Sequence, residues 1–128
     1  MNLPMAMVDY MKAGGLGEEA LRSGGELPLV FDDTLRVRLV PLADGTIVLE
    51  SRVRPMPEGA AERERLVERA LKLSFGRMQD HADTLTLSED RQALRLQSRL
   101  PADASRMDLE TRLEAHLNAL AFWRDALA

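Results

Sequence analysis

The sequence predicts an α+β fold in which helices pack on an antiparallel sheet, with the elements in the order α-β-β-β-α-β-β-α. Three observations support this prediction. The chain has 128 residues, of which 45% are hydrophobic and 30% charged, as in a soluble globular domain. Apolar residues alternate with polar ones in two separate blocks, as in half-buried strands, and they recur at helical spacing before, between and after these blocks. No linker or internal repeat interrupts residues 1–128, so we expect a single domain.

The first predicted element is a short amphipathic helix from Pro4 to Ala13. Proline suits the first turn of a helix, and Gly14 and Gly15 suit its end. The apolar side chains at helical spacing are Met7, Val8, Tyr10 and Met11. Because further glycines follow, we expect residues 1–26 to form this helix and a mobile glycine-rich segment with at most another helical turn or two.

Three antiparallel strands are predicted between Leu27 and Val53, where apolar and charged residues alternate. The pair Asp44-Gly45 is typical of a type I′ hairpin turn, and Asp32-Asp33-Thr34 predicts an earlier turn. Proline cannot donate a hydrogen bond to a neighbouring strand, so prolines are expected to end the second and third strands. These prolines are Pro41, Pro55 and Pro57.

A second helix is predicted from Ala60 to Phe75, after which Gly76 can terminate it. The residues expected on its inward side are Leu66, Val67, Ala70, Leu71 and Leu73. A second hairpin then follows, with Leu85 and Leu87 in one strand and residues 94–100 in the other, joined by a turn over residues 88–91.

The last helix is predicted to begin at Ser105, whose hydroxyl can form a capping box with Asp108, and to run nearly to the C-terminus. One apolar line on this helix consists of Leu109, Leu113, Leu117, Leu120 and Leu127. A second consists of Ala115, Ala119, Phe122 and Ala126, with Trp123 between the two lines. Since the apolar arc is so wide, we expect this helix to pack against more than one neighbouring element, and one of these neighbours can belong to another chain.

Residues that carry chemistry in other proteins are scarce in this sequence. The chain has no cysteine, which excludes disulfides, thiolate catalysis and cysteine-ligated metals. It also lacks phosphate-binding loops, nucleophile elbows and zinc-protease motifs, so neither a metal nor a cofactor is predicted. We interpret His81 and His116 as solvated or core-flanking residues. Asp32 and Asp33 suggest a small enzyme that uses carboxylates, but aspartate favours turns, and turn chemistry is the preferred interpretation.

The net charge of −4 disfavours nucleic acid and anionic membranes as partners. Asp9 interrupts the apolar stretch near the N-terminus, so neither a signal peptide nor a membrane span is predicted. Six arginines are nevertheless expected on the outer face of the sheet: Arg36, Arg38, Arg52, Arg54, Arg95 and Arg99. A small RNA-binding module is therefore a distant alternative. Glu50 on the same face disfavours it, and so do aromatic residues that look like core rather than a base-stacking platform. These aromatic residues are Tyr10, Phe31, Phe75, Phe122 and Trp123.

Four segments of the chain resemble the class I (CesT-like) chaperones of bacterial type III secretion. They are the helix 60–75, the segment 82–90 (ADTLTLSED), the strand 93–101 (ALRLQSRLP) and the ending 121–127 (AFWRDAL). The resemblance covers nearly the whole chain in the order of its elements, and residues 27–127 in motif detail. The glycines within residues 12–26 depart from the longer, continuous first helix of that family.

This resemblance implies a non-catalytic protein of the bacterial cytoplasm that needs no nucleotide. The expected partner is a secreted effector or a secretion regulator, whose N-terminal region stays extended and export-competent. The resemblance also implies a dimer, because the second helix commonly contributes to dimerisation in this family. A homodimer, a heterodimer and a role as a regulatory adaptor all remain open. By position, the implied dimer residues are Leu66, Val67, Ala70, Leu71 and Ser74, which can equally pack on the chain's own sheet.

Cargo contacts are expected where apolar side chains form grooves. An extended segment binds by inserting apolar side chains into such grooves and by adding main-chain hydrogen bonds at an open strand edge. Methionine is flexible and polarizable, and four of the seven methionines lie within residues 1–11. The candidate cargo residues are Leu3, Met7, Val8 and Met11 in the first helix region, together with Val40 and Leu42 in the second strand region. The alternative is that Met7 and Met11 complete the core.

Overall fold

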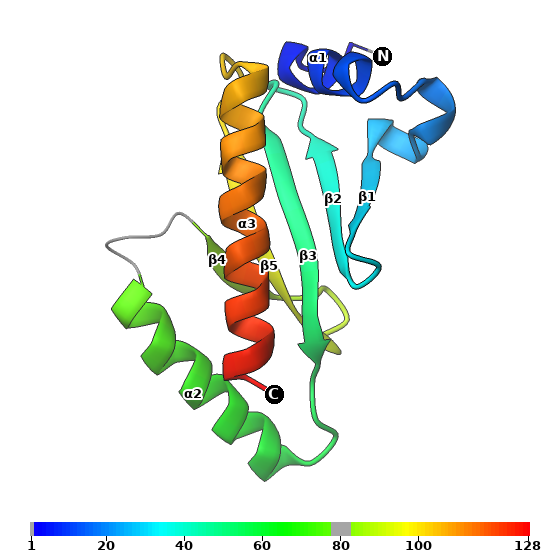
Figure 1. Cartoon of the computed structure of the whole chain (residues 1–128). Coiled ribbons are helices and arrows are strands. Elements are labelled where there is room, and N and C mark those ends of the chain that lie inside the picture. The colour runs from blue at the N-terminus through cyan, green and yellow to red at the C-terminus, as the bar shows by residue number, and fades with distance from the viewer. Residues whose placement is uncertain (1, 78–82) are drawn as a thin grey trace.

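The computed structural model describes residues 2–77 and 83–128, and its elements follow the predicted order (Figure 1). The helices are α1 (Met5–Ala13), α2 (Ala60–Arg77) and α3 (Arg106–Ala126). The strands are β1 (Leu27–Phe31), β2 (Leu35–Pro41), β3 (Ile47–Pro55), β4 (Thr84–Leu87) and β5 (Ala93–Leu100). The predicted α+β fold is therefore confirmed. No helix within the described ranges is both long and apolar enough to cross a membrane.

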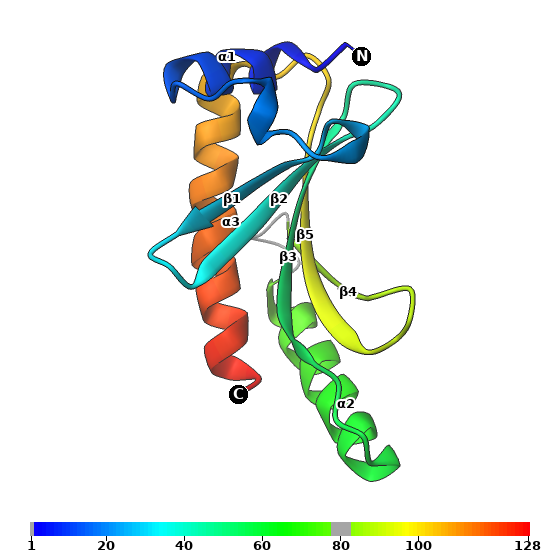
Figure 2. The ribbon, with the colours of Figure 1, turned by 90° about the vertical axis from the view of Figure 1, so that its right-hand side faces the viewer.

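The five strands form one antiparallel sheet in the order β1-β2-β3-β5-β4, and α3 lies along one of its faces (Figure 1). Helix α1 lies at the end where α3 begins, and α2 lies near the end where α3 stops. Strands β2 and β3 pair only from Arg38 opposite Glu50 to Pro41 opposite Ile47. Beyond Arg38 the two strands diverge, so that the sheet separates into a β1–β2 part and a β3–β5–β4 part (Figure 2).

Two clusters of buried side chains form the core between the sheet and α3. The first joins α1, the β1–β3 strands and the first half of α3, with Met7, Leu39 and Leu109 fully buried at its centre. The second joins the second half of α3 to β5 and α2, and Trp123 is its largest member. Helix α3 contributes to both clusters, which accounts for the wide apolar arc seen in its sequence.

The prolines and the capping box behave as predicted. Strand β2 ends at Pro41 and β3 ends at Pro55, where the missing N–H stops further pairing. At the start of α3 the hydroxyl of Ser105 accepts a hydrogen bond from Asp108 N at 3.1 Å. The Asp108 carboxylate in turn accepts one from Ser105 N at 2.9 Å. These two bonds satisfy N–H groups that the first helical turn leaves free.

The assignment of the type I′ turn to Asp44-Gly45 is wrong, because this turn occurs in the preceding hairpin. A type I′ turn needs a positive φ at both central residues. Asp32 and Asp33 have φ values of 50° and 61°, and Thr34 N donates to Phe31 O across them. In the later loop only Gly45 has a positive φ, and Leu42 N bonds to Thr46 O around a wider turn.

The expected end of the second helix at Gly76 is also wrong, since α2 continues through Gly76 to Arg77. Arg77 is held there by an ion pair of 3.2 Å with Asp83 and by the aromatic rings at the end of α3, which outweighs the weak helix propensity of glycine. Between α1 and β1, the glycine-rich segment forms two short 3₁₀ turns, Glu18–Ala20 and Ser23–Gly25, rather than a further α-helix.

Two residues on the sheet depart from the predicted alternation. The β3–β5 register shifts between Arg52 and Arg54, and the shift places Arg54 opposite Leu94. Arg54 then donates to Leu127 O at the end of α3, at 2.6 Å, so it does not join the other arginines on the outer face. Leu87, expected to point inward, is 43% exposed at the end of the short edge strand β4.

Candidate interaction surfaces

A hollow of about 600 Å³ lies between α1 and the glycine-rich segment that follows it. Its apolar walls come from Leu3, Val8 and Met11 on the helix side and from Leu16 and Leu21 on the other. Leu3, Val8, Leu16 and Leu21 are half-buried, so their side chains still present surface to a ligand. The hollow therefore combines three of the predicted cargo residues. It also includes Leu16 and Leu21, which are not among the predicted cargo residues; the only signal for them in the sequence is a large apolar side chain within a glycine-rich stretch.

A second hollow of about 550 Å³ lies on another side of α1, against α3 and the end of β1. Tyr10, Phe31 and Leu117 contribute half-buried apolar surface to it, while Glu110 and Glu114 supply charge at its rim. Burial and, to a lesser degree, Glu110 raise the pKa of the Tyr10 hydroxyl above its usual value, so this hydroxyl stays neutral at physiological pH. Helix α1 is therefore flanked by two hollows with apolar walls.

The remaining predicted cargo residues lie in different environments. Met7 is fully buried in the first core cluster, and Met11 is 6% exposed, so the core interpretation fits Met7 while Met11 serves both the core and the hollow. Val40 is half-buried on β2, and Leu42 is 38% exposed in the following turn. Neither of these two residues lines the hollow beside α1.

Strand β1 forms an open edge of the sheet, since among the described strands it pairs with β2 alone. Main-chain groups on the other side of an edge strand are free to pair with an added strand. Its outward-facing Val30 is 53% exposed, and Pro28 removes one N–H donor from the strand. This edge is therefore a physically suitable place for an extended segment to join the sheet.

Helix α2 divides its apolar residues between two sides. Leu66 and Ala70 are buried in the second core cluster, and Ser74 is half-buried. Val67 and Leu71, which the sequence placed on the inward side, are instead 40% and 57% exposed. Phe75, expected to be core, is 74% exposed and continues the same line at a spacing of four residues. We call Val67, Leu71 and Phe75 the apolar line of α2.

The C-terminal end of α2 is attached to α3 by a polar and aromatic cluster. The guanidinium of Arg77 lies over the ring of Phe122, 4.3 Å from its centroid, and pairs with Asp83 at 3.2 Å. The other oxygen of Asp83 accepts a hydrogen bond from Trp123 Nε1 at 3.2 Å. This cluster fixes α2 at one end, although few of its other residues pack against the body (Figure 1).

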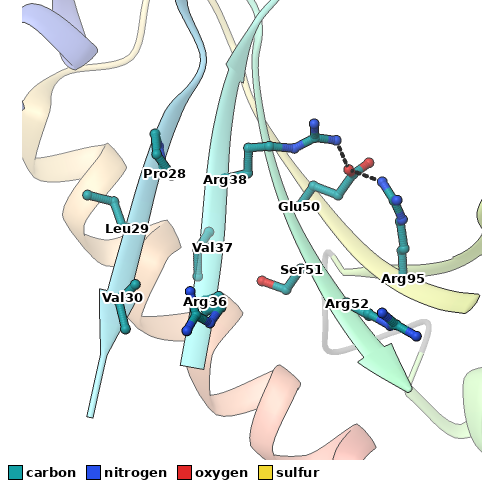
Figure 3. Close-up of a pocket in the computed structure, with 10 residues that line it drawn as sticks. All are labelled: Pro28, Leu29, Val30, Arg36, Val37, Arg38, Glu50, Ser51, Arg52 and Arg95. Carbon is teal, nitrogen blue, oxygen red and sulfur yellow. Dashed lines mark hydrogen bonds and ion pairs between the residues drawn. The ribbon is translucent and has the colours of Figure 1, made fainter. Parts of the chain in front are cut away.

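The outer face of the sheet carries an ionic network centred on Glu50. Arg95 donates to Glu50 Oε1 at 2.8 Å, and Arg38 pairs with the same carboxylate (Figure 3). Gln97 donates to Glu50 Oε2 at 2.7 Å. Arg38 also pairs with Glu26 at 3.2 Å. Burial alone would raise the pKa of Glu50, but the hydrogen bonds from Gln97 and Arg38, together with the positive charges of Arg38 and Arg95, outweigh burial and hold this pKa below its usual value.

His116 lies in the middle of α3, buried between the helix and the sheet. Its Nε2 is 2.9 Å from Ser51 Oγ, and its Nδ1 is 2.8 Å from Ser98 Oγ, so both ring nitrogens have a partner. A serine next to a histidine resembles an activated nucleophile, but all three side chains are at most 4% exposed. This arrangement suits a neutral imidazole that joins sheet and helix, and burial lowers the pKa of His116 to about 4. The other histidine, His81, lies outside the described residues.

No group of three or more potential ligands that could hold a metal ion occurs within residues 2–77 and 83–128. Asp32 and Asp33 occupy the two central positions of the tight turn between β1 and β2, where turn geometry accounts for both residues. The described residues therefore form hollows, an open strand edge and an exposed apolar line, which are features suited to contacts with other polypeptides.

Comparison with protein-family models gives a match over residues 12–124 to the Tir chaperone protein (CesT) family. No curated protein matches the chain in sequence. Among solved structures, the crystal structure of the ExsC–ExsE complex contains a chain that aligns with a TM-score of 0.73 at 20% identity, covering 99% of this chain and 97% of that one.

Two further solved structures share the fold. The HopA1–SchA chaperone–effector complex aligns with a TM-score of 0.68 at 17% identity, covering 91% of this chain and 88% of the other. The heterodimeric ExoU–SpcU complex from the type III secretion system of Pseudomonas aeruginosa aligns with a TM-score of 0.68 at 13% identity, covering 93% and 95%. At such identities these likenesses show a common fold.

Proposed function

The chain belongs to the CesT family of Tir chaperone proteins, and on this premise we propose that it binds the N-terminal region of a type III secreted effector or secretion regulator. In this role it keeps the bound segment extended and competent for export. Two structures that share its fold support this choice of cargo, because one is named as a chaperone–effector complex and the other as a complex from a type III secretion system. We further propose that the protein acts in the bacterial cytoplasm, before export, and that it binds its cargo without catalysis.

The two hollows beside α1 are the observation that carries this proposal. Together with the open edge of β1, they offer a cargo segment apolar surface for its side chains and free main-chain groups for its backbone. A segment bound in this way is extended by geometry, because strand addition requires an extended backbone. The free energy of apolar burial offsets the entropy lost when a disordered segment is ordered.

We propose that the apolar line of α2 is the dimer surface. Val67, Leu71 and Phe75 form a continuous exposed strip on a helix that its own sheet leaves largely uncovered. Leu66 and Ala70 support this strip from the core side, and Ser74 lies half-buried beside it. A second copy of the chain would cover the strip with an identical one, which is the arrangement that two-fold symmetry produces.

Cargo binding tests the proposed function. The candidate cargo is a co-purified protein with a disordered N-terminal segment, and the readout is its affinity and its protection from limited proteolysis. Val8→Asp puts a charge on the wall of the hollow beside α1, so we expect cargo affinity to fall at least about tenfold. Met107→Asp, on a side chain that is 73% exposed on α3, is the matched control and is expected to bind as the wild type does. Equal affinity of the two variants would contradict the proposal.

A further inference from the structure

A hollow of about 260 Å³ lies on the outer face of the sheet, at the place where β2 and β3 diverge (Figure 3). The last paired residues, Arg38 and Glu50, lie at its closed end. On the side that faces α3, the guanidinium of Arg124 spans the two diverging chains, donating to Thr34 O at 2.8 Å and to Arg52 O at 2.9 Å. The separation of β2 and β3 is therefore held by defined contacts, and the hollow is a built feature of the sheet.

The charges around this hollow are unbalanced. Four arginines line it, namely Arg36, Arg38, Arg52 and Arg95, against the single carboxylate of Glu50. Glu50 is shared by Arg38 and Arg95, whereas no ion pair to the exposed Arg36 or Arg52 occurs within the part of the chain that the structure describes. The lining thus has an excess of three positive charges, one of which Glu26 offsets from outside the lining through its ion pair with Arg38, in a chain whose net charge is −4.

Without a bound anion, the placement of these arginines lowers the stability of the sheet. Arg52 lies directly opposite Arg95 in the β3–β5 register, and like charges in opposite positions of neighbouring strands repel one another. Arg95 moreover has a buried Nε without a hydrogen-bond partner in the described structure. Such an arrangement is stabilised when an anion binds between the guanidinium groups, because charge-assisted hydrogen bonds to a carboxylate then replace the repulsion.

The other wall of the hollow is apolar. It consists of Pro28, Leu29 and Val30 of the edge strand β1, and Val30 is 53% exposed. A small inorganic anion would make no use of this wall, whereas the aliphatic stem of an acidic side chain and the backbone that carries it would contact the apolar wall while the carboxylate reaches the arginines. The sticks in Figure 3 show the two walls on either side of β2, with Arg36 between Val30 and Arg52.

From this combination we propose that the hollow between β2 and β3 binds an acidic side chain of an extended cargo segment, with Arg36 and Arg52 as the residues that select it. The inference rests on the proposed function, since it assigns a chemical preference to the same cargo. A cargo strand added at the edge of β1 lies beside this hollow, so one segment can use both surfaces. The selected sequence alternates acidic and apolar residues, because successive side chains of a strand point to opposite faces.

The test is a nuclear magnetic resonance titration of the full chain with two synthetic peptides. One is a twelve-residue peptide of alternating glutamate and valine, and its twin carries glutamine in place of every glutamate. We expect the glutamate peptide to shift the Arg36 and Arg52 side-chain Nε–H resonances and to bind at least about tenfold more tightly than its twin. Raising the ionic strength is expected to reduce this difference.

The variants locate the effect. The double variant Arg36→Gln/Arg52→Gln is expected to bind the glutamate peptide no better than the glutamine twin. Arg99→Gln removes the same kind of charge from an exposed position on β5 outside the hollow, and it is expected to bind as the wild type does. Both substituted arginines of the double variant are exposed, so its thermal midpoint is expected to stay unchanged or to rise at low salt.

Three results would overturn the inference. These are equal affinity for the two peptides, an equal loss in Arg99→Gln, and tighter Arg36- and Arg52-dependent binding of a uridine oligonucleotide, which would assign the hollow to nucleic acid. If the double variant binds natural cargo as the wild type does while Val8→Asp does not, the acidic preference is wrong and the proposed function stands. If neither variant changes cargo binding, the hollows beside α1 are not the cargo site.

Discussion

Helices α1 and α2 lie at opposite ends of the molecule and differ in how they use their apolar side chains (Figure 1). Helix α1 has only nine residues, yet it buries Ala6, Met7 and Met11 in the core and forms a wall of two hollows. Helix α2 has 18 residues and buries only Leu66 and Ala70. The apolar side of the short helix is therefore covered by its own chain, whereas the long helix presents apolar surface that the described residues of its own chain do not cover. Amphipathic periodicity alone does not distinguish these two cases.

The largest expected effect is the difference in stability loss between a buried and an exposed methionine of α1. Met7→Asp places a charge among fully buried apolar side chains and should destabilise the protein by at least about 4 kcal/mol. If that variant does not fold, Met7→Ala should still cost about 3 kcal/mol through the cavity it leaves. Met5, in the same helix, is 67% exposed, so Met5→Asp should change stability by less than about 0.5 kcal/mol. Urea unfolding measures all three variants, and similar losses for Met5→Asp and Met7→Asp would show that α1 is not docked as described.

The next largest effect concerns His116, which joins the middle of α3 to the sheet. Burial lowers its pKa from 6.5 to about 4, so within this range the unfolded chain binds a proton that the folded chain excludes. The stability contributed by neutral His116 is therefore complete above pH 6.5 and is lost as the pH falls toward 4, by roughly 3 kcal/mol.

Urea unfolding at several pH values checks this expectation against His116→Gln, which cannot titrate. The wild type should lose more stability than the variant between pH 6.5 and 4. Glu50, whose pKa is lowered, contributes stability that is lost at still lower pH in both proteins, so it does not affect the difference. Parallel pH profiles for the two proteins would mean that His116 is accessible to water.

The third effect tests whether the apolar line of α2 is an interface. Val67→Glu combined with Leu71→Glu puts two charges on the exposed strip, so the dissociation constant of the dimer should rise at least about 100-fold. The variant should remain folded, because neither side chain is buried. Arg69→Glu, on an exposed position of the same helix outside the strip, is the control and should leave the dimer intact.

Sedimentation velocity over a range of protein concentrations separates the possible results. The wild type and Arg69→Glu should sediment as dimers, and the double variant as a monomer. A wild type that remains monomeric throughout would contradict a homodimer. An association that appears only when a different chain is added would assign the strip to a heterodimer.

Local sequence patterns predicted most of the fold. The alternation of residues 35–54, the prolines and the Ser105–Asp108 capping box are short-range signals, and their physical causes act within a few residues. The misplaced type I′ turn is a local error, since both loops carry aspartate, whereas two other errors arose where distant contacts decide the outcome. Arg77 keeps α2 helical beyond Gly76 because Asp83 and Phe122 bind it, and no local pattern contains that information. Likewise, the register shift that turns Arg54 toward α3 depends on pairing with β5.

The candidate surfaces were predicted less completely than the fold. Helical spacing places Met7 and Val8 close together, but only the packing of α1 on the sheet decides that Met7 is buried and that Val8 faces the hollow. Leu16 and Leu21 have no periodicity that would connect them to α1. The separation of β2 from β3 is a property of sheet twist and of Arg124, and it changes a row of alternating arginines into the lining of a hollow.

The most direct measurement of the central claim is hydrogen–deuterium exchange on a co-purified cargo, alone and in complex with this chain. Cargo held as an extended segment should gain protection only within its N-terminal region, while the chaperone gains protection in β1 and in the residues beside α1. Protection throughout a folded cargo domain, with α1 and β1 unchanged, would contradict the account.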